Sequence, residues 1–362
     1  MDLLIFIYLI LFPFGKLLGQ TQDLLVLIIS VFGFIKHRNY RINNFVLICI
    51  FSLIFSLSFF NLPQILNGLF YLIRLISYFY LSQIVNLQFG KVERKRKLII
   101  NSLITVGIFI AIFGWIQYLI FPDLRALKTL GWDDHYFRLV STFLDPAFTG
   151  ILLVLTEILV LIKTVKKKTG LNYLLNVFLL ITVLFTYSRS SYLALFFAVL
   201  FLFYKFRKKV ILIFLALFLI FIPLLPRPGG EGVNLARTYT VVDKFQNSKT
   251  AFKVIKKSPV FGIGFDNICI ATLNNTNIHS CSGFDNSILF IIATTGVIGF
   301  VIFLQMIYKI IVNTKFDAFG FGLLASLIAI FIHGMFTETF FYNFVLGWMA
   351  ILIGVTRKEV KG

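Results

Sequence analysis

Apolar runs of membrane-crossing length recur along the whole chain, and they constrain its fold more than any other feature. About twelve runs approach the roughly 20 apolar residues that cross a bilayer as a helix. They lie near 3–18, 24–35, 45–60, 65–88, 98–121, 142–162, 171–187, 190–204, 210–225, 287–312, 318–337 and 340–356. Hydrophobic residues make up 59% of the chain, whereas soluble domains contain about 45–50%. We therefore expect an all-α integral membrane protein, a polytopic bundle of about twelve transmembrane helices that forms one domain over residues 1–362.

Basic residues gather in alternate connections between these runs and give the chain a net charge of +19. By the positive-inside rule, such connections face the cytoplasm, so both termini are expected there. The first run reads as a retained helix, because it has neither a basic leading segment nor a small-residue cleavage site. We attribute the charge to orientation in the plasma membrane rather than to a nucleic-acid partner. The clusters are Lys36/Arg38/Arg41, Lys91/Arg94–Lys97, Lys163/Lys166–Lys168, Lys205/Arg207–Lys209 and Arg357/Lys358/Lys361.

A long polar stretch, residues 226–286, interrupts the apolar pattern and is expected on the extracytoplasmic side. Within it, residues at intervals of four, three, four and three predict one face of a helix. They are Val241, Phe245, Ser248, Phe252 and Ile255. Lysines occupy much of the remaining surface and Ser258-Pro259 ends the pattern, so a basic amphipathic helix is expected to lie along the lipid headgroups. Arg237 precedes its first turn, where helix N–H groups and the helix dipole favour an anion.

Four arginines lie where a positive charge needs a partner. Arg189 stands in FTYSRSSYLAL, at a tight turn between two apolar runs, and Arg74 lies within NGLFYLIRLISYFYLSQ. An ionisable residue inside a span indicates a functional site, although a structural ion pair is the alternative for Arg74. Arg138, in FRLVSTFLDPAFTG, and Arg237 lie at expected outer boundaries. The outer arginines either bind a substrate anion or reach the lipid headgroups.

Asp285 and Asn286 lie where the long loop re-enters the membrane, just ahead of SILFII. A carboxylate there can accept a proton from a sugar hydroxyl as a general base, or the pair can cap the next helix. His333 and Glu338, in HGMFTETFF, are a second acid–base candidate, although a lone His in a span is often a helix–helix hydrogen bond. Arginines that fork phosphate oxygens, with a carboxylate on the same side, suit a substrate that carries phosphates on a lipid and hydroxyls on a sugar.

No motif of a metal or cofactor site is present in the sequence. It has no DxD-type acidic pair for a divalent ion, so a metal-free reaction is expected. Cys49 lies in an apolar run, while Cys269 and Cys281 share the long loop without CxxC or His/Cys spacing. These two cysteines either form a disulfide or remain free thiols. A disulfide would stabilise the fold by about 3 kcal/mol in the chain-entropy view.

The succession FRLVSTFLDPAFTG, FTYSRSSYLAL, ARTYTVVDKF…KKSPVFGIGFDN and DNSILFIIATTGVIGFV resembles the O-antigen polymerase and O-antigen ligase superfamily. The resemblance covers roughly residues 135–305. It implies an integral membrane glycosyltransferase that acts on the outer face of the plasma membrane. The implied donor is a polyprenyl-diphosphate-linked oligosaccharide, with no nucleotide sugar and no metal cofactor. Membrane lipids, a flippase and chain-length regulator proteins would be its partners.

By this resemblance, Arg189 and Arg237 hold the donor's diphosphate. Ligases of the family carry His-Asn where this chain has Asp285-Asn286, which is closer to polymerase members. We therefore expect a polymerase in which Asp285 acts on the acceptor hydroxyl. The expected substrate-binding residues are Arg138, Arg74, Asn286, His333 and Glu338.

Three alternatives remain open. They are a ligase that passes the glycan to a lipid or protein, a transporter of lipid-linked sugars, and a structural membrane protein. Inverted repeats or helices broken at Gly or Pro in mid-membrane would indicate a transporter, and neither is evident in the sequence.

Overall fold

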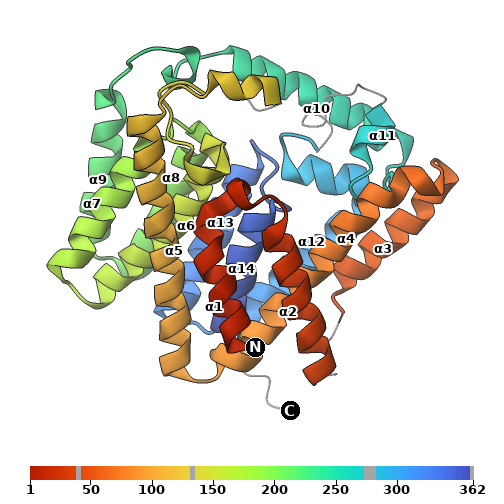
Figure 1. Ribbon diagram of the computed structural model, residues 1–362, viewed down its shortest axis with the longest axis horizontal. Coiled ribbons are helices and arrows are strands. Elements are labelled where there is room, and N and C mark those ends of the chain that lie inside the picture. The colour runs from red at the N-terminus through yellow and green to blue at the C-terminus, as the bar shows by residue number, and fades with distance from the viewer. Residues whose placement is uncertain (38–41, 131–134, 273–282, 359–362) are drawn as a thin grey trace.

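The computed structural model describes residues 1–37, 42–130, 135–272 and 283–358, and regular secondary structure in these ranges is entirely helical. Figure 1 shows the helices as an upright bundle, with α10 running across one end. The α-helices are α1 (Asp2–Leu11), α2 (Thr21–His37), α3 (Asn44–Phe55), α4 (Leu62–Val85), α5 (Glu93–Ile120), α6 (Pro146–Lys166), α7 (Gly170–Leu184), α8 (Arg189–Phe206), α9 (Lys209–Leu224), α10 (Tyr239–Lys257), α11 (Ile268–Thr272), α12 (Ser287–Val312), α13 (Ala318–Gly334) and α14 (Asn343–Thr356).

A helix lies at each expected run, but the helices differ in their capacity to span a bilayer. Within the described residues, 5 helical segments are long and apolar enough to cross a membrane. They are Leu62–Gly90, Glu93–Ile120, Pro146–Lys166, Arg189–Phe206 and Ser287–Val312. The all-α membrane architecture is thus confirmed, while the number of twelve spans stays a prediction.

The first expected run, 3–18, is not one helix. α1 ends at Leu11, and Phe12–Leu18 forms a 3-10 helix that is interrupted at Gly15, where φ is +52°. A Cβ atom at Gly15 would lie 2.8 Å from the carbonyl oxygen of Thr142. The backbone therefore bends at Gly15 where the segment that precedes α6 packs closely against it. The apolar composition of the run 3–18 does not predict this bend.

The expected cytoplasmic clusters gather at one end of the bundle. The N-terminus and the end of α14 lie at the end opposite α10 (Figure 1). At that end Arg96 forms an ion pair with Asp317, and the ammonium groups of Lys166 and Lys205 lie 4.8 and 4.2 Å from ring centroids at the start of α13. This arrangement agrees with the sequence pattern, and the side of the membrane that each end faces stays a prediction.

α6 forms the centre of the bundle and positions the polar end of the fold. It packs against α5, α7, α8 and α13, and 83% of its most apolar window is buried, against 44–50% for the other candidate spans. Asp145 caps its first turn by accepting hydrogen bonds from Ala147 N and Phe148 N. The fixed start of α6 therefore supports the segments around it that carry Arg138 and the start of α8.

α12 is broken at its tenth residue, Gly296. This break corrects the interpretation of the sequence that no membrane helix is interrupted. Gly296 has φ +69° and ψ −177°, a region that is essentially restricted to glycine. Backbone groups beside the break bond to the segment before α11, with Ile263 N donating to Ala293 O (3.0 Å) and Gly264 N to Thr294 O (3.1 Å). A bilayer tolerates irregular backbone where protein supplies such partners. The run 287–312 is apolar on both sides of Gly296, so its hydropathy does not predict the break.

Replacing Gly296 by Ala is expected to destabilise the protein by about 1–3 kcal/mol from backbone strain alone. A Cβ atom at this position would also lie 2.0 Å from the carbonyl oxygen of Val260, so the clash adds to the loss. Gly170→Ala is the matched control, since a Cβ there meets nothing within 4 Å. Thermal unfolding of the purified proteins in detergent measures the effect, and equal melting temperatures for the two variants would contradict it.

The long loop contains the expected helix, α10, but the face that it buries is different from the apolar face expected. α10 buries Ala251 and Val254, which pack into a cluster with residues of α12. Val241, Phe245 and Phe252 remain more than half exposed. These side chains are free to meet lipid headgroups, as the sequence pattern predicts, and that contact stays a prediction.

Candidate functional site

Three of the predicted arginines, Arg138, Arg189 and Arg237, lie together at the start of α8, and we call them the arginine cluster. Arg138 donates from Nε to Thr186 O (3.1 Å) and from Nη2 to Tyr187 O (3.3 Å). Arg237 donates from Nη2 to the same Tyr187 carbonyl (3.4 Å). The carbonyls that precede α8 therefore bring side chains from the α5–α6 connection and from the long loop to one place.

Arg189 joins α8 to the start of α10. Its Nη1 donates to Leu235 O (3.3 Å) and Arg237 O (2.9 Å), and its Nη2 donates to Thr240 Oγ1 (2.5 Å). Ser188 caps α8 by accepting from Ser191 N, which fixes the turn from which Arg189 projects. The planar guanidinium thus uses three acceptors from the long loop, a geometry that a lysine ammonium does not reproduce.

The arginine cluster brings three positive charges to one place. Within the described ranges, no carboxylate forms an ion pair with any of its three members. Arg237 is only 8% exposed, and burial, followed by the charge of Arg189, lowers its pKa. Burial and then Arg237 lower the pKa of Arg138 to about 10. An anion bound here would relieve this repulsion, so the cluster is a candidate anion site.

Asp285 lies beside α10, one turn beyond the residue of that helix that contacts Arg189. Its carboxylate is 3.4 Å from Lys244 Nζ, and its backbone N–H donates to Asn247 Oδ1 (3.1 Å). Lys244 also donates to the carbonyl of Phe336, in the connection between α13 and α14. Half-exposed and held by α10, this carboxylate remains accessible to a substrate.

Asn286, rather than Asp285, caps α12. Asn286 Oδ1 accepts from Ile288 N (2.9 Å) and Leu289 N (3.1 Å), and Nδ2 donates to Met335 O (3.1 Å). The capping alternative that the sequence leaves open for the pair is therefore satisfied by Asn286 alone. The carboxylate of Asp285 is not needed to begin the helix.

α10 links these two groups. Thr240, Lys244 and Asn247 lie four and three residues apart, on one face of the helix. Thr240 contacts Arg189, and Lys244 and Asn247 contact Asp285. The rise of an α-helix places Thr240 and Lys244 about 6 Å apart along its axis. A compact anion at the arginine cluster and a hydroxyl at Asp285 would therefore be neighbours.

Glu338 of the α13–α14 connection and Asp266 of the long loop form a second acidic group. A Cβ atom at Gly283 would lie 2.9 Å from Glu338 Oε2, so the glycine lets the loop approach this carboxyl. Burial first, and then the charge of Asp266, raise the pKa of Glu338 well above its ordinary value, and Arg74 opposes this rise. Burial raises the pKa of Asp266 as well. Glu338 is therefore better suited to donate a hydrogen bond than to act as a base at neutral pH.

Arg74 forms a structural ion pair, which was the alternative that the sequence left open. Its Nη2 lies 2.7 Å from Asp23 Oδ2, with both side chains less than a quarter exposed. Tyr78 donates its hydroxyl to Asp23 Oδ1 (2.9 Å), and Asn343 Nδ2 donates to the same carboxylate (3.3 Å). This network joins α2, α4 and α14 beneath the acidic group.

The hydrogen bonds of His333 do not involve the arginine cluster. It is fully buried in the last turn of α13, and its Nδ1 lies 2.7 Å from Thr339 Oγ1. Thr339 N in turn donates to Ser287 Oγ (2.8 Å). The hydrogen bonds of His333 thus hold the α13–α14 connection against the start of α12.

Sequence reasoning did not identify Asp266, and it treated Lys244 only as part of a basic surface. A signal for Asp266 is present, because the tetrapeptide GFDN occurs at 264–267 and again at 283–286. The second copy carries Asp285. For Lys244 the sequence offers no comparable signal, since its role depends on which face of α10 meets α12.

The disulfide between Cys269 and Cys281, which the sequence leaves open, involves a residue outside the described part of the chain. Cys269 lies in α11 and is disulfide-bonded, Cys281 is outside the described residues, and Cys49 is a buried free thiol. The partner of Cys269 stays a prediction.

Residues 174–304 match the sequence model of a family described as O-antigen ligase. The match confirms the resemblance to the O-antigen ligase and polymerase superfamily and supports a function of that broad type. It spans Arg189, Arg237, Lys244 and Asp285. The matched segment is just over a third of the chain, and Arg74, Arg138, His333 and Glu338 lie outside it. No curated protein matches the sequence.

Proposed function

We propose that the chain is a polymerase-type glycosyltransferase that joins polyprenyl-diphosphate-linked oligosaccharide repeats on the outer face of the plasma membrane. The observation that carries this proposal is the arrangement along α10. One turn contacts an arginine cluster that forms no ion pair among the residues that the structure describes, and the next turn holds an accessible carboxylate. An anionic leaving group and a nucleophilic hydroxyl require such a pair of neighbouring groups.

In this scheme the arginine cluster binds the diphosphate of the donor. Guanidinium groups fork phosphate oxygens and remain charged at neutral pH. When the bond between the anomeric carbon and the diphosphate oxygen breaks, its electron pair stays on the diphosphate. The added negative charge develops beside Arg189, Arg237 and Arg138, where fixed cations stabilise the transition state.

Asp285 accepts the proton of the acceptor hydroxyl. That oxygen, on the terminal sugar of another lipid-linked repeat, attacks the anomeric carbon from the face opposite the diphosphate, and the configuration inverts. The products are one longer lipid-linked glycan and one free polyprenyl diphosphate. No metal ion is assigned a step, because the arginines supply the positive charge that the leaving group needs.

The remaining predicted residues support this arrangement. We assign Glu338 to donate a hydrogen bond to a sugar oxygen, because burial raises the pKa of its carboxyl group. Asn286, His333 and Arg74 use their polar atoms mainly within the protein. We therefore assign them to positioning α12, the α13–α14 connection and α4 around the substrate.

A ligase is the second candidate, because the matching family is described as O-antigen ligase. It would use the same donor site and a different acceptor. The break in α12 at Gly296 is a feature that transporters share, because their substrate sites are often formed by interrupted membrane helices. However, backbone groups of the same chain form hydrogen bonds with the residues beside the break. These groups are therefore not free to coordinate a transported ion or substrate.

Analysis of surface glycans from cells that lack the gene distinguishes these functions. For a polymerase, we expect single repeats to remain on the lipid carrier, with no long chains. Full-length chains that remain on the carrier would indicate a ligase. Repeats that accumulate on the cytoplasmic face would indicate a transporter and would contradict the proposal.

A further inference from the structure

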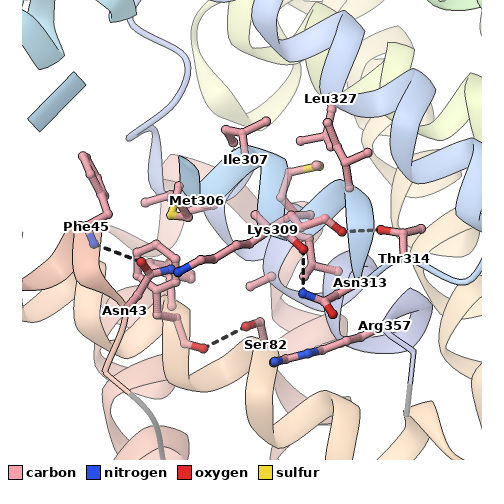
Figure 2. Close-up of a pocket in the computed structure, with 18 of the residues that line it drawn as sticks. Asn43, Phe45, Ser82, Met306, Ile307, Lys309, Asn313, Thr314, Leu327 and Arg357 are labelled. Carbon is pink, nitrogen blue, oxygen red and sulfur yellow. Dashed lines mark hydrogen bonds between the residues drawn. The ribbon is translucent and has the colours of Figure 1, made fainter. Parts of the chain in front are cut away.

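A cavity of about 1280 Å³ opens between α3, α4, α12, α13 and α14, away from the arginine cluster. This volume exceeds the roughly 300–1,000 Å³ of typical small-molecule pockets. Figure 2 shows the cavity, with Ile307 and Leu327 toward one end and Asn43, Asn313 and Arg357 toward the other. Most of its lining is aliphatic or aromatic, so its interior suits hydrocarbon chains.

Aromatic rings line the cavity at the end near the α13–α14 connection. The rings of Phe303 and Phe340 stack with centroids 5.4 Å apart, and Phe331 lies 6.4 Å from Phe340. Phe340 is two residues beyond Glu338. These rings lie between the cavity and the segment that carries the acidic group.

The opposite rim is basic. Its cations are Lys91, Lys309, Arg357 and Lys358, amides are interspersed, and no Asp or Glu lines the cavity within the described residues. Other cations at this end of the bundle have acidic partners, as in the pairs Lys95–Asp2, Arg96–Asp317 and Lys97–Glu93. Among the described residues, neither Lys309 nor Arg357 forms an ion pair. The rim is therefore complementary to an anion.

The rim is far from the proposed catalytic groups. Asp285 precedes the first residue of α12, Ser287, whereas Lys309 lies in the last turn of that helix. The part of α12 beyond its break at Gly296 alone rises about 18 Å up to Lys309. A diphosphate held by the arginine cluster cannot also contact Lys309. An anion bound at the rim would therefore belong to a different molecule.

We propose that this cavity holds the acyl chains of an anionic glycerophospholipid whose phosphate is bound by Lys309 and Arg357. The rim lies at the end that the positive-inside rule assigns to the cytoplasm. Basic pockets between transmembrane helices on that side bind anionic headgroups. Arg357 supplies a fork for two phosphate oxygens and Lys309 supplies a point charge. The inference does not depend on the proposed catalytic function.

Native mass spectrometry of the purified protein in mild detergent tests this site. The probes are phosphatidylglycerol and phosphatidylcholine with identical acyl chains, each titrated separately. We expect the wild type to retain phosphatidylglycerol preferentially. The double variant Lys309→Gln/Arg357→Gln should bind phosphatidylglycerol about thirtyfold more weakly, since each basic residue near the surface contributes about 1 kcal/mol. Its binding of phosphatidylcholine should weaken much less, because the choline cation offsets the charge of that lipid's phosphate.

Two further variants separate the charge from the cavity. Lys166→Gln/Lys205→Gln removes two cations at the same end that do not line the cavity, and it should leave lipid binding unchanged. Leu327→Trp fills the cavity and should weaken both lipids without touching the rim, so it also tests the proposal if the double variant fails to fold. Equal retention of the two lipids by the wild type would overturn the proposal. Displacement of phosphatidylglycerol by added polyprenyl phosphate would overturn it as well, because the cavity would then belong to the carrier lipid.

Discussion

Arg189→Ala is expected to lower the rate of glycan polymerisation by about 10²–10³, the loss typical when one stabilising donor is removed from a developing oxyanion. Arg189 lies within the matched family segment. Its guanidinium donates to the backbone carbonyl of Arg237, in a cluster that forms no ion pair with a carboxylate of the described residues. Arg189→Lys keeps the charge but loses the planar fork, so it should recover only part of the activity. Polymer formation from purified lipid-linked repeats is the measurement.

The Arg189 side chain also forms hydrogen bonds with the start of α10, so its structural effect must be separated from its catalytic effect. Thr240→Val removes one acceptor of Arg189 and leaves the cluster's charge intact, so it should cost much less than Arg189→Ala. Arg227→Ala, an exposed arginine in the same loop, is the control for net charge and should be near normal. If Thr240→Val is as damaging as Arg189→Ala while both proteins remain folded, Arg189 acts by holding the loop and not on the diphosphate.

Asp285→Asn is expected to reduce the rate by about 10²–10⁴, the usual contribution of a general base. This substitution separates a catalytic role of Asp285 from a capping role, because Asn286 alone caps α12. The ion pair with Lys244 joins two side chains that are 36% and 43% exposed, and such pairs contribute about 0.2–1 kcal/mol. A large loss of activity in a folded variant therefore has to come from the chemistry.

Lys244→Met provides the matched control for Asp285→Asn. It removes the same ion pair but retains the carboxylate, so its activity should fall much less. Glu338→Gln keeps a hydrogen-bond donor and should also be milder. Near-normal activity of Asp285→Asn, together with a large loss in Glu338→Gln, would assign the base to Glu338 instead.

The sequence predicts the helices well because hydropathy is a local property. α12 begins at Ser287 and ends at Val312, as the apolar run 287–312 indicates, and α10 appears where the spacing of Val241, Phe245 and Phe252 predicts a helix. The break at Gly296 is not predicted, because it depends on a distant segment that supplies partners for the freed backbone groups. An apolar run looks the same whether its helix is continuous or interrupted.

The residue types of the candidate site are also evident from the sequence, but their partners are not. Arg138, Arg189 and Arg237 come from three separate segments, and they meet because two carbonyls before α8 accept from two of them. Periodicity does not reveal that meeting. Likewise, the sequence leaves Asp285 and Asn286 as equal candidates for the helix cap, and the backbone direction at α12 decides in favour of Asn286.

Turnover of purified lipid-linked repeats tests the central claim most directly. The protein, reconstituted in vesicles with EDTA present, is given polyprenyl-diphosphate-linked single repeats, and both glycan length and free polyprenyl diphosphate are followed. We predict lipid-linked dimers and longer chains, with one polyprenyl diphosphate released for each new linkage. Repeats that remain single, that cross the bilayer without forming a bond, or that extend only after a divalent ion is restored would contradict the proposed reaction.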